Sequence, residues 1–353
     1  RTPIGKNMGQ FKDVRARQLA ITAGAEAIKR ADIDPKLIDG IVMGECFTAM
    51  EGSLAARQVS MRLGFDERSN ACVVNQNCAS GMRALDIQAN NILLGKEDIG
   101  MVIGVESMTN APYVLEKARM GYRMGDSKIF DNMLHDGLID ELSGGHMGLT
   151  AENVAEKYGI TREECDKIAV RSHNLACKAI DEGIFKDEIV PVVLKTRKGE
   201  KVITDDEHPI RNCTMETLAK LKPAFKKDGV ITAANASGIN DAAAAVILMS
   251  WEKCQELGKK PMAKLVTCVA EGVAPEVMGL GPAVAMPKAL KAAGLKWEDI
   301  DYFEVNEAFS AQVLGVERML KEDYGYVVDW DKTNKFGSGI ALGHPVGCTA
   351  LRI

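Results

Sequence analysis

Apolar residues follow two alternating spacings along this chain, and each spacing predicts a different kind of element. Short runs of β-branched and other apolar residues predict buried strands at 71–74, 99–105 and 246–249. Apolar residues three or four positions apart predict amphipathic helices at 13–31, 82–93, 151–158 and 163–182. A Thr161-x-x-Glu164 capping box precedes the last of these. This alternation predicts a layered α/β architecture.

An internal repeat predicts that the chain contains two similar halves. Residues 27–44 and 289–306 share Ala, Lys, Ala, Ile and Asp at identical places, and most other apolar positions stay apolar. Each copy predicts the end of a helix, a short acidic connection and a strand. The two copies are 262 residues apart. The position in the second half that corresponds to Cys78 is therefore 340, close to His344. Pairing of the two halves would therefore bring Cys78 and His344 to one site.

The region between the halves differs in composition. From about residue 110 to 235 it is richer in charge and is interrupted by Gly and Pro, which predicts an inserted loop domain. We therefore expect an N-terminal half at 1–109, a loop domain at 110–237 and a C-terminal half at 238–353.

Composition excludes several classes of protein. The 353 residues carry a formal net charge of −5, with 26% charged and 46% hydrophobic residues, which is ordinary for a globular protein. A nucleic-acid-binding protein normally shows a basic excess instead. No apolar run approaches the ~18 residues that a membrane helix needs. Nine scattered cysteines without C-x-x-C pairs argue against a disulfide framework and favour a reducing cytoplasm.

Cys78 occupies the turn between the strand predicted at 71–74 and the helix predicted from 82. A thiol at a helix N-terminus feels the positive end of the helix dipole and unpaired N–H groups. We therefore expect the thiolate, which is the nucleophilic form, to be favoured there. Ala79, Ser80 and Gly81 are small enough to let a substrate carbonyl approach. The alternative is a buried structural cysteine without chemistry.

Three short motifs occur in an order that points to one family. They are the Cys78 turn, Asn-Glu-Ala-Phe at 306–309 and Gly-His-Pro at 343–345, and further matching stretches lie at 1–5, 146–153 and 233–241. On these motifs the chain resembles the thiolase family over nearly its whole length. The resemblance implies the thiolase fold, in which two βαβαβαββ halves form a five-layered αβαβα sandwich with an inserted loop domain.

The resemblance also implies an activity, that of an acetyl-CoA C-acetyltransferase. In this reaction Cys78 takes an acyl group as a thioester, and the carbanion of a second acetyl-CoA attacks the acyl-enzyme in a Claisen condensation. The products are acetoacetyl-CoA and free CoA, and reverse thiolysis returns two acetyl-CoA. Coenzyme A thioesters would be the substrates, with no permanently bound cofactor. The family further implies a homodimer or homotetramer.

The same resemblance assigns roles to the other two motifs. His344 would act as the base for Cys78 and as an oxyanion donor, since a neutral imidazole can do either according to which nitrogen carries the proton. Asn306 would hold the water that completes the oxyanion site, and Glu307 would orient neighbouring backbone. The alternatives are a surface or satisfied core histidine and a turn or strand-end asparagine. The glycine and proline that flank the histidine weaken the first alternative, because they fix a tight loop around the ring.

Substrate-binding residues are expected in the loop domain and the C-terminal half. By resemblance, those that border the acyl pocket or the CoA path are Leu138, His146, Met147, Met278, Ala308 and Phe309. Ser237 matches a serine that contacts the pantetheine arm, and Arg211 matches an arginine that packs on the adenine end. Residues 211–228 carry five basic and two acidic residues, a balance that suits phosphates. The alternatives are core methionines, a turn hydroxyl and a solvated charged face.

Signatures of other chemistries are missing from the sequence. His344-x-x-x-Cys348 resembles half a metal site, but no second pair has ligand spacing, so we expect no bound metal. The sequence also has no phosphate-binding loop and no dinucleotide fingerprint, so we do not expect an ATP or nicotinamide enzyme.

Two interpretations other than an acetyltransferase remain open. One is a 3-ketoacyl-CoA thiolase that acts on longer chains, although residues 110–146 resemble the tetramer-forming loop and pocket border of short-chain enzymes. The other is a thiolase-like CoA-binding protein without activity, which would have no reason to keep Cys78, Asn306 and His344 together. A ketoacyl synthase would need a second suitable histidine. Departures from the common family pattern at 334–339, at 347–352 and at Asn77 leave the chain-length preference open.

The family pattern also leads us to expect residues beyond both ends of this sequence. One strand would precede Arg1, and a Gly-rich segment carrying a second cysteine would follow Ile353. In the family that cysteine is the base that removes the α-proton. Cys348 lies in the Gly-His-Pro loop, while Cys254 and Cys268 lie in a predicted helix end and a predicted strand, so we expect none of them to replace it.

Overall fold

The computed structural model describes residues 1–197 and 199–353. Its α-helices are α1 (Ala16–Ala31), α2 (Ala55–Leu63), α3 (Ser80–Leu93), α4 (Met147–Tyr158), α5 (Arg162–Glu182), α6 (Met215–Ala219), α7 (Trp251–Glu256), α8 (Gly281–Ala293), α9 (Ser310–Tyr324), α10 (Gly339–Leu342) and α11 (Val346–Arg352). Its strands are β1 (Gly5–Lys6), β2 (Gly40–Gly44), β3 (Asn70–Val74), β4 (Ile99–Ser107), β5 (Tyr113–Leu115), β6 (Ile129–Asp131), β7 (Ile139–Asp140), β8 (Gly145–His146), β9 (Val192–Thr196), β10 (Gly199–Ile203) and β11 (Asn240–Met249).

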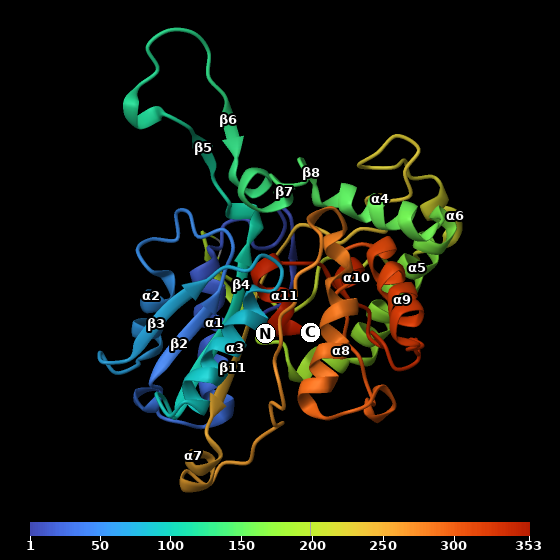
Figure 1. Cartoon of the computed structure of the whole chain (residues 1–353). Helices are drawn as coiled ribbons and strands as arrows, with labels where there is room; N and C mark the ends of the chain where they lie inside the picture. Colours follow the sequence, from blue (N-terminus) through green and yellow to red (C-terminus); the bar gives the residue numbers. More distant parts are fainter. Residues whose placement is uncertain (198) are drawn as a thin grey trace.

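A five-stranded mixed sheet in the order β1-β11-β4-β2-β3 organises the N-terminal part of the molecule (Figure 1). β2 runs parallel to β3 and β4, while β11 runs antiparallel to β4 from Asp241 opposite Ser107 to Met249 opposite Ile99. The strands predicted at 71–74, 99–105 and 246–249 are confirmed as parts of β3, β4 and β11.

Helices cover both faces of this sheet. Leu19 of α1 and Val59 of α2 belong to the apolar core on one face, together with Met43 of β2. On the other face, Ala84 of α3 packs with Val42 of β2, and α11 adds a side chain to the same cluster. Because β2 and β4 are buried on both sides, nearly all of their residues are apolar or glycine.

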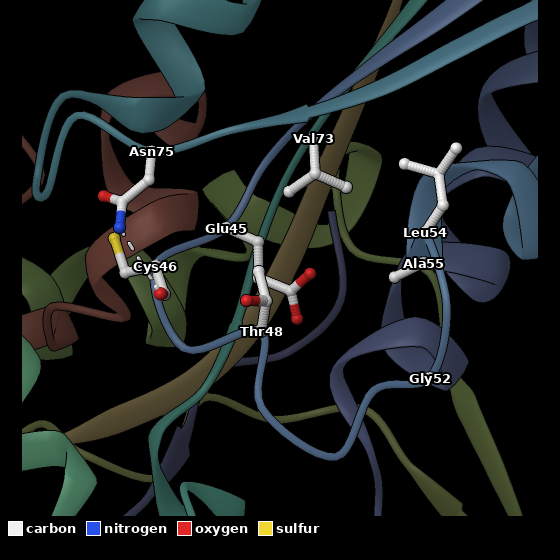
Figure 2. A pocket seen from close by; sticks show the side chains of 8 residues that line it. All are labelled: Glu45, Cys46, Thr48, Gly52, Leu54, Ala55, Val73 and Asn75. Atoms are coloured by element: carbon white, nitrogen blue, oxygen red, sulfur yellow. Dashed lines mark hydrogen bonds between the residues drawn. The ribbon is translucent and has the colours of Figure 1, made fainter.

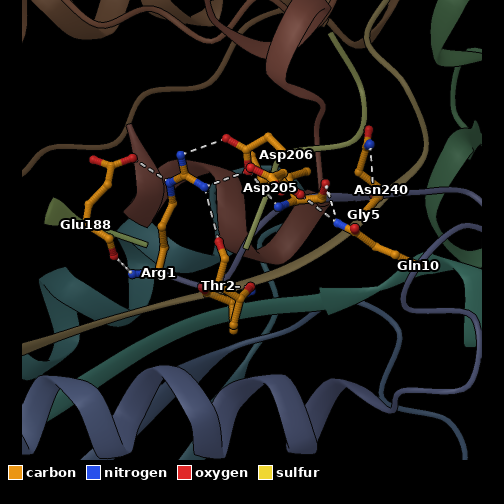
Figure 3. A network of polar contacts seen from close by, with 10 residues as sticks. Arg1, Thr2, Gly5, Gln10, Glu188, Asp205, Asp206 and Asn240 are labelled. Atoms are coloured by element: carbon orange, nitrogen blue, oxygen red, sulfur yellow. Dashed lines mark hydrogen bonds and ion pairs between the residues drawn. The ribbon is translucent and has the colours of Figure 1, made fainter. Parts of the chain in front are cut away.

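A polar network around Arg1 ties the middle region to the N-terminal sheet (Figure 3). The guanidinium donates to the Asp206 carboxylate at 2.8 and 2.9 Å, and its Nε donates to Glu188 Oε1 at 2.5 Å. Asp206 Oδ1 also accepts the backbone N–H of Ile4 at 2.8 Å. The Arg1 side chain is only 4% exposed, so this is a buried pair that holds the segment leading into β1.

β11 follows the middle region in sequence but lies inside the N-terminal sheet, between β1 and β4. The segment that we predicted as the C-terminal half, 238–353, therefore starts with a strand that belongs spatially to the first half. The division at 109 and 237 stays a prediction.

The C-terminal half shows the repeated element order but not a second assigned sheet among the described residues. α8, a 3₁₀ turn at Trp297–Asp299 and an extended segment follow one another just as α1, Pro35–Leu37 and β2 do. The extended segment pairs at one bridge, where Phe303 N donates to Lys332 O at 2.9 Å and Asn334 N donates to Phe303 O at 3.0 Å. Two residues further on, the backbone of Val305 is paired by a side chain and not by a strand. Its N–H donates to Asn334 Oδ1 at 2.8 Å, and its carbonyl oxygen accepts from Asn334 Nδ2 at 2.8 Å.

Two smaller expectations about this half have different outcomes. Cys254 lies in α7, as predicted for a helix end. Cys268 lies in a stretch without regular structure, so the strand predicted there is wrong for the described structure. A strand forms only where its backbone groups find a neighbouring strand, and the stretch at 262–274 has none within the described ranges.

The helices predicted in the middle region are confirmed. α4 and α5 pack with α9 around a second apolar core that includes Val154, Ile168 and Val313. The capping box of α5 forms as predicted, with Glu164 N donating to Thr161 Oγ1 at 3.2 Å and Thr161 N donating to Glu164 Oε2 at 2.8 Å. β5 and β6 form a hairpin arm that projects away from the rest of the molecule (Figure 1).

Replacing Thr161 with Ala removes the hydroxyl that satisfies the first turn of α5. We expect a loss of about 1 kcal/mol in the free energy of unfolding, measured by urea denaturation. Thr161→Ser keeps the hydroxyl and serves as the control, so an equal loss in both variants would contradict a capping role.

Candidate active site

Cys78 lies where the sequence places it, in the turn between the end of β3 at Val74 and the start of α3 at Ser80. Asn77, just before it, adopts a left-handed backbone conformation with φ of 47°. The Ser80 hydroxyl fixes the turn, because it accepts the N–H of Gln76 at 2.8 Å and donates to Asn77 O at 2.7 Å. The turn therefore presents Cys78 at the helix N-terminus with its side chain exposed.

His344 lies in the loop between α10 and α11 and is 6% exposed. Its backbone N–H donates to Asn240 Oδ1 at 2.9 Å, and Asn240 Nδ2 donates to Gly5 O at 3.0 Å (Figure 3). Gly343 has φ of 100°, and a Cβ on it would lie 2.5 Å from Asn240 Cγ. Only glycine fits both the conformation and this close approach.

The turn with Cys78 and the loop with His344 meet because α3 and α11 touch near their N-terminal ends. A Cβ on Gly81, the second residue of α3, would lie 3.0 Å from the carbonyl oxygen of Gly347, the second residue of α11. Cys78 and His344 each lie just before one of these helix ends. The two helix ends that follow Cys78 and His344 therefore lie side by side, and the shared site that the repeat offset predicted stays a prediction.

Asn306 lies against the imidazole of His344. Its Nδ2 is 3.5 Å from both ring nitrogens, and its Oδ1 is buried with no hydrogen-bond partner within the described part of the chain. The next residue, Glu307, is fully buried and accepts from the Ser172 hydroxyl at 2.5 Å and from Asn334 Nδ2 at 3.0 Å. Glu307 therefore fixes the segment that carries Asn306.

Glu106 at the end of β4 is a site residue that the sequence analysis missed. Its buried carboxylate accepts the N–H groups of Cys46 at 3.1 Å, Phe47 at 3.0 Å and Gly347 at 2.8 Å. Cys46 in turn donates its S–H to Asn77 O at 3.2 Å. The signal in the sequence was an acidic residue directly after seven buried strand residues.

The pKa of Cys78 corrects one expectation. Burial among protein atoms raises the pKa of this thiol to about 11, and the Glu106 carboxylate adds to the effect, although the side chain is accessible to solvent. The backbone N–H at the turn lowers the pKa by less than burial raises it. At neutral pH the resting group is therefore a thiol, and the expected preference for thiolate is wrong, because desolvation outweighs the helix terminus.

His344 has the opposite shift and so complements the thiol. Burial, with a smaller contribution from the Arg352 guanidinium, lowers the pKa of its imidazole to about 4. The ring is therefore neutral at pH 7 and has a free lone pair on one nitrogen. A neutral imidazole is the form that a general base for a protonated thiol requires.

Most residues predicted for the substrate side gather around one apolar core. The ring of His146 stacks on Phe225 at 4.7 Å between centroids, and Phe225 meets Phe309 edge-on at 6.0 Å. Other predicted residues that pack on the same core are Met147, Met278 and Ala308. Ser237 joins them because its N–H donates to Ala308 O at 2.9 Å. The charge balance of residues 211–228 gave no sign of Phe225, whose role depends on its contacts with His146 and Phe309.

Leu138 and Arg211 lie outside this group. Leu138 ends a π-helical turn at Leu134–Leu138 and packs with Phe47 and with Val346, two residues after His344. Arg211 is exposed and forms an ion pair with Asp181 of α5 at 2.9 Å. The contacts of the described residues do not link Arg211 to the other predicted substrate-binding residues.

A cavity of about 350 Å³ lies beside the Cys78 turn, on the side of β3 and the loop after β2 (Figure 2). Its lining residues are Glu45, Cys46, Thr48, Gly52, Leu54, Ala55, Val73 and Asn75. Glu45 is fully buried, and both of its carboxylate oxygens lack a hydrogen-bond partner in the part of the chain that is described. Burial, together with Glu106 and Glu51, raises the pKa of Glu45 to about 9.

Two properties of the described residues bear on other classes of function. Among residues 1–197 and 199–353, no group of three or more His, Cys, Asp and Glu side chains has the arrangement of a metal site. Within the same ranges, no helix has the length and apolar character needed to cross a bilayer.

Comparison with known families decides the classification. The model of the thiolase N-terminal domain matches residues 1–252, and the model of the thiolase C-terminal domain matches residues 259–353. The chain belongs to the thiolase family. The predicted thiolase fold is thereby confirmed, with β11 inside the segment that the N-terminal model covers.

Similar thiolases have been named and solved. A protein of Syntrophomonas wolfei subsp. wolfei named acetyl-CoA acetyltransferase is 50% identical over all of this chain and 88% of its own length. A solved acetyl-CoA acetyltransferase from Syntrophomonas wolfei superposes with a TM-score of 0.99 at 63% identity, covering 99% of this chain and 88% of that one. Human mitochondrial 3-ketoacyl-CoA thiolase superposes with a TM-score of 0.94 at 38% identity, over 99% and 87%.

Glu45 gives the thiolase a measurable pH dependence. Because its pKa is raised from 4.5 to about 9 on folding, it stabilises the native state fully below about pH 4.5, and this contribution is lost as the pH rises toward 9. Glutamine stays neutral at every pH. Between pH 6 and 8, the free energy of unfolding of Glu45→Gln should therefore fall less steeply than that of the wild type, by roughly 1 kcal/mol per pH unit, measured by urea denaturation.

Glu67→Gln is the matched control, because it removes the same charge at an exposed position. We expect this variant to keep the wild-type slope. A Glu45→Gln curve parallel to that of the wild type would show that Glu45 is ionised in the native state.

Proposed function

We propose that this thiolase is an acetyl-CoA C-acetyltransferase that interconverts two acetyl-CoA with acetoacetyl-CoA and free CoA. The observation that carries the proposal is the contact between the N-terminal ends of α3 and α11, because Cys78 and the neutral His344 lie just before these two helix ends. Relatives named acetyl-CoA acetyltransferase support the choice of substrate, at 50% and 63% identity.

Acylation starts from the neutral pair. As the Cys78 sulfur attacks the thioester carbon of acetyl-CoA, its proton passes to the free ring nitrogen of His344. The bond between the carbonyl carbon and the CoA sulfur then breaks, and the departing CoA thiolate takes the proton from the imidazolium. The acetyl group remains on Cys78 as a thioester, which keeps it activated for a second attack.

Negative charge develops on the thioester oxygen during this step, so hydrogen-bond donors must face it. Once protonated, His344 can donate from the same nitrogen that received the proton. Asn306, beside the ring, would contribute through a water held by its unpartnered Oδ1. In the second half-reaction the carbanion of another acetyl-CoA attacks the acyl group. The family resemblance implies that a second cysteine removes the α-proton to leave this carbanion.

The acyl pocket and the CoA path would use the core described around Phe225. His146, Met147, Met278, Ala308 and Phe309 lie around it, and Leu138 approaches from the His344 side through Val346. Ser237 would contact the pantetheine arm. Arg211 would reach the adenine end only after releasing Asp181. We assign this surface to a loop domain at 110–237 together with the C-terminal half.

We further propose a homodimer or homotetramer in a reducing cytoplasm. β3 is an open edge of the sheet, with its residues at most half-buried. The arm formed by β5 and β6 exposes large apolar side chains, namely Tyr113, Leu115, Met120, Tyr122, Met124 and Ile129. The cysteines of the described structure are free, which suits a reducing compartment.

The first test is acetylation of Cys78. Brief incubation with acetyl-CoA should raise the intact mass by one acetyl group, and Cys78→Ala should show no gain, because the sulfur nucleophile is gone. Cys268→Ala, a partly buried cysteine in an irregular stretch, should still gain the group. An unmodified wild-type protein would support the alternative of a thiolase-like CoA-binding protein without activity.

A second test addresses the rival 3-ketoacyl-CoA thiolase, whose human mitochondrial example shares the fold. Thiolysis of acetoacetyl-CoA and of 3-ketohexadecanoyl-CoA should be compared at equal enzyme concentration. We expect kcat/KM to favour acetoacetyl-CoA by at least about tenfold, since each excluded methylene of a long chain costs binding energy. A preference for the long chain would assign the protein to the rival activity.

A further inference from the structure

The imidazole of His344 has a second hydrogen-bond partner that none of the motifs contains. Thr349, one helical turn further on in α11, places its hydroxyl oxygen 2.7 Å from His344 Nδ1. Thr349 is 1% exposed, so water does not compete for this contact. His344 is therefore held at both ends, by Asn240 on its backbone N–H and by Thr349 on its ring.

The direction of this hydrogen bond follows from the other contact of the hydroxyl. Thr349 Oγ1 lies 3.0 Å from the carbonyl oxygen of Pro345, four residues earlier, as is common for threonine in a helix. A hydroxyl has a single proton, so when it donates to Pro345 O its oxygen can only accept from the ring. Nδ1 then carries the imidazole proton, and Nε2 is left with the lone pair.

The amide of Asn306 is compatible with this assignment but does not select it. Its Nδ2, which is a donor, lies 3.5 Å from both ring nitrogens, and a lone pair on Nε2 would accept from it. The opposite tautomer would place a proton on Nε2, and its only lone pair, on Nδ1, would face the Thr349 hydroxyl.

We propose that Thr349 is a positioning residue that fixes His344 in the tautomer protonated at Nδ1, so that Nε2 is the atom that accepts the Cys78 proton. This inference rests on the proposed function. All atoms and protons of the step are accounted for. The sulfur proton moves to Nε2 as the carbon–sulfur bond to Cys78 forms. The bond to the CoA sulfur then breaks, and the CoA thiolate takes the proton from Nε2. One nitrogen thus serves first as base, then as oxyanion donor and last as acid.

The test compares Thr349→Val with Thr349→Ser. Valine keeps the β-branched shape and removes the hydroxyl, while serine keeps the hydroxyl and removes a methyl group. We expect the single-turnover rate of Cys78 acetylation to fall roughly 10–100-fold in Thr349→Val. KM for acetyl-CoA should stay unchanged, because the hydroxyl does not touch substrate, and Thr349→Ser should acetylate close to the wild-type rate.

Nitrogen NMR of the histidine-labelled protein tests the tautomer directly, with His344→Gln used to assign the signal. The expected result is a proton on Nδ1 in the wild type and its loss or redistribution in Thr349→Val. A proton on Nε2 in the wild type, or wild-type acetylation in Thr349→Val, would overturn the inference. A melting temperature for each variant shows whether a slow rate comes from unfolding.

The two proposals fail in different ways. If the wild-type protein takes up no acetyl group, the acetyltransferase proposal fails. If the wild type and both variants acetylate equally fast, the acetyltransferase stands and only the role of Thr349 is refuted. If Thr349→Ser is as slow as Thr349→Val, the hydroxyl is not the group that matters, and the inference is refuted as well.

Discussion

Three backbone N–H groups, from the loop after β2 and from the start of α11, converge on the buried carboxylate of Glu106, and the geometry of the site depends on this interaction. Two of them belong to Cys46 and Phe47 after β2, and the third belongs to Gly347 at the start of α11. An unpaired carboxylate in the interior would be costly, and these donors offset much of that cost, although the pKa of Glu106 is still raised to about 7. Through Cys46 the same carboxylate supports the Cys78 turn. Both reacting side chains are therefore positioned from one buried point.

Burial also sets the protonation of the reacting pair. It raises the pKa of Cys78 and lowers that of His344, so the neutral thiol and the neutral imidazole are the resting forms at pH 7. The proton consequently moves as the sulfur attacks, not before it. A resting thiol of this kind reacts slowly with adventitious electrophiles, since the thiolate is the reactive form. Substrate binding, which brings the carbonyl to the sulfur, is then what makes the pair reactive.

Local signals in the sequence were sufficient for some of this picture. The apolar runs of β3, β4 and β11, the capping box of α5 and the motifs at Cys78 and His344 each lie within a few residues, and each formed where it was predicted. Features that depend on distant residues were missed. Three such features join segments far apart in the chain. They are the pairing of β11 with β4, the three N–H donors to Glu106, and the pairing of the Val305 backbone with the Asn334 side chain. The pKa of Cys78 belongs to the same class, because the helix end is local while burial is a property of the whole fold.

The order of strands has a consequence for how the protein folds. β4 occupies the middle of the sheet, but one of its two neighbours, β11, is made only after the whole middle region has been synthesised. β1 pairs with β11 and therefore also depends on this late strand. During synthesis, β1 and one edge of β4 therefore wait unpaired while more than a hundred residues follow. Sheets closed by such distant pairings fold slowly, and open edges invite association with other chains. The buried pair of Arg1 and Asp206 also depends on the middle region, because it can form only after that region has been made and has docked.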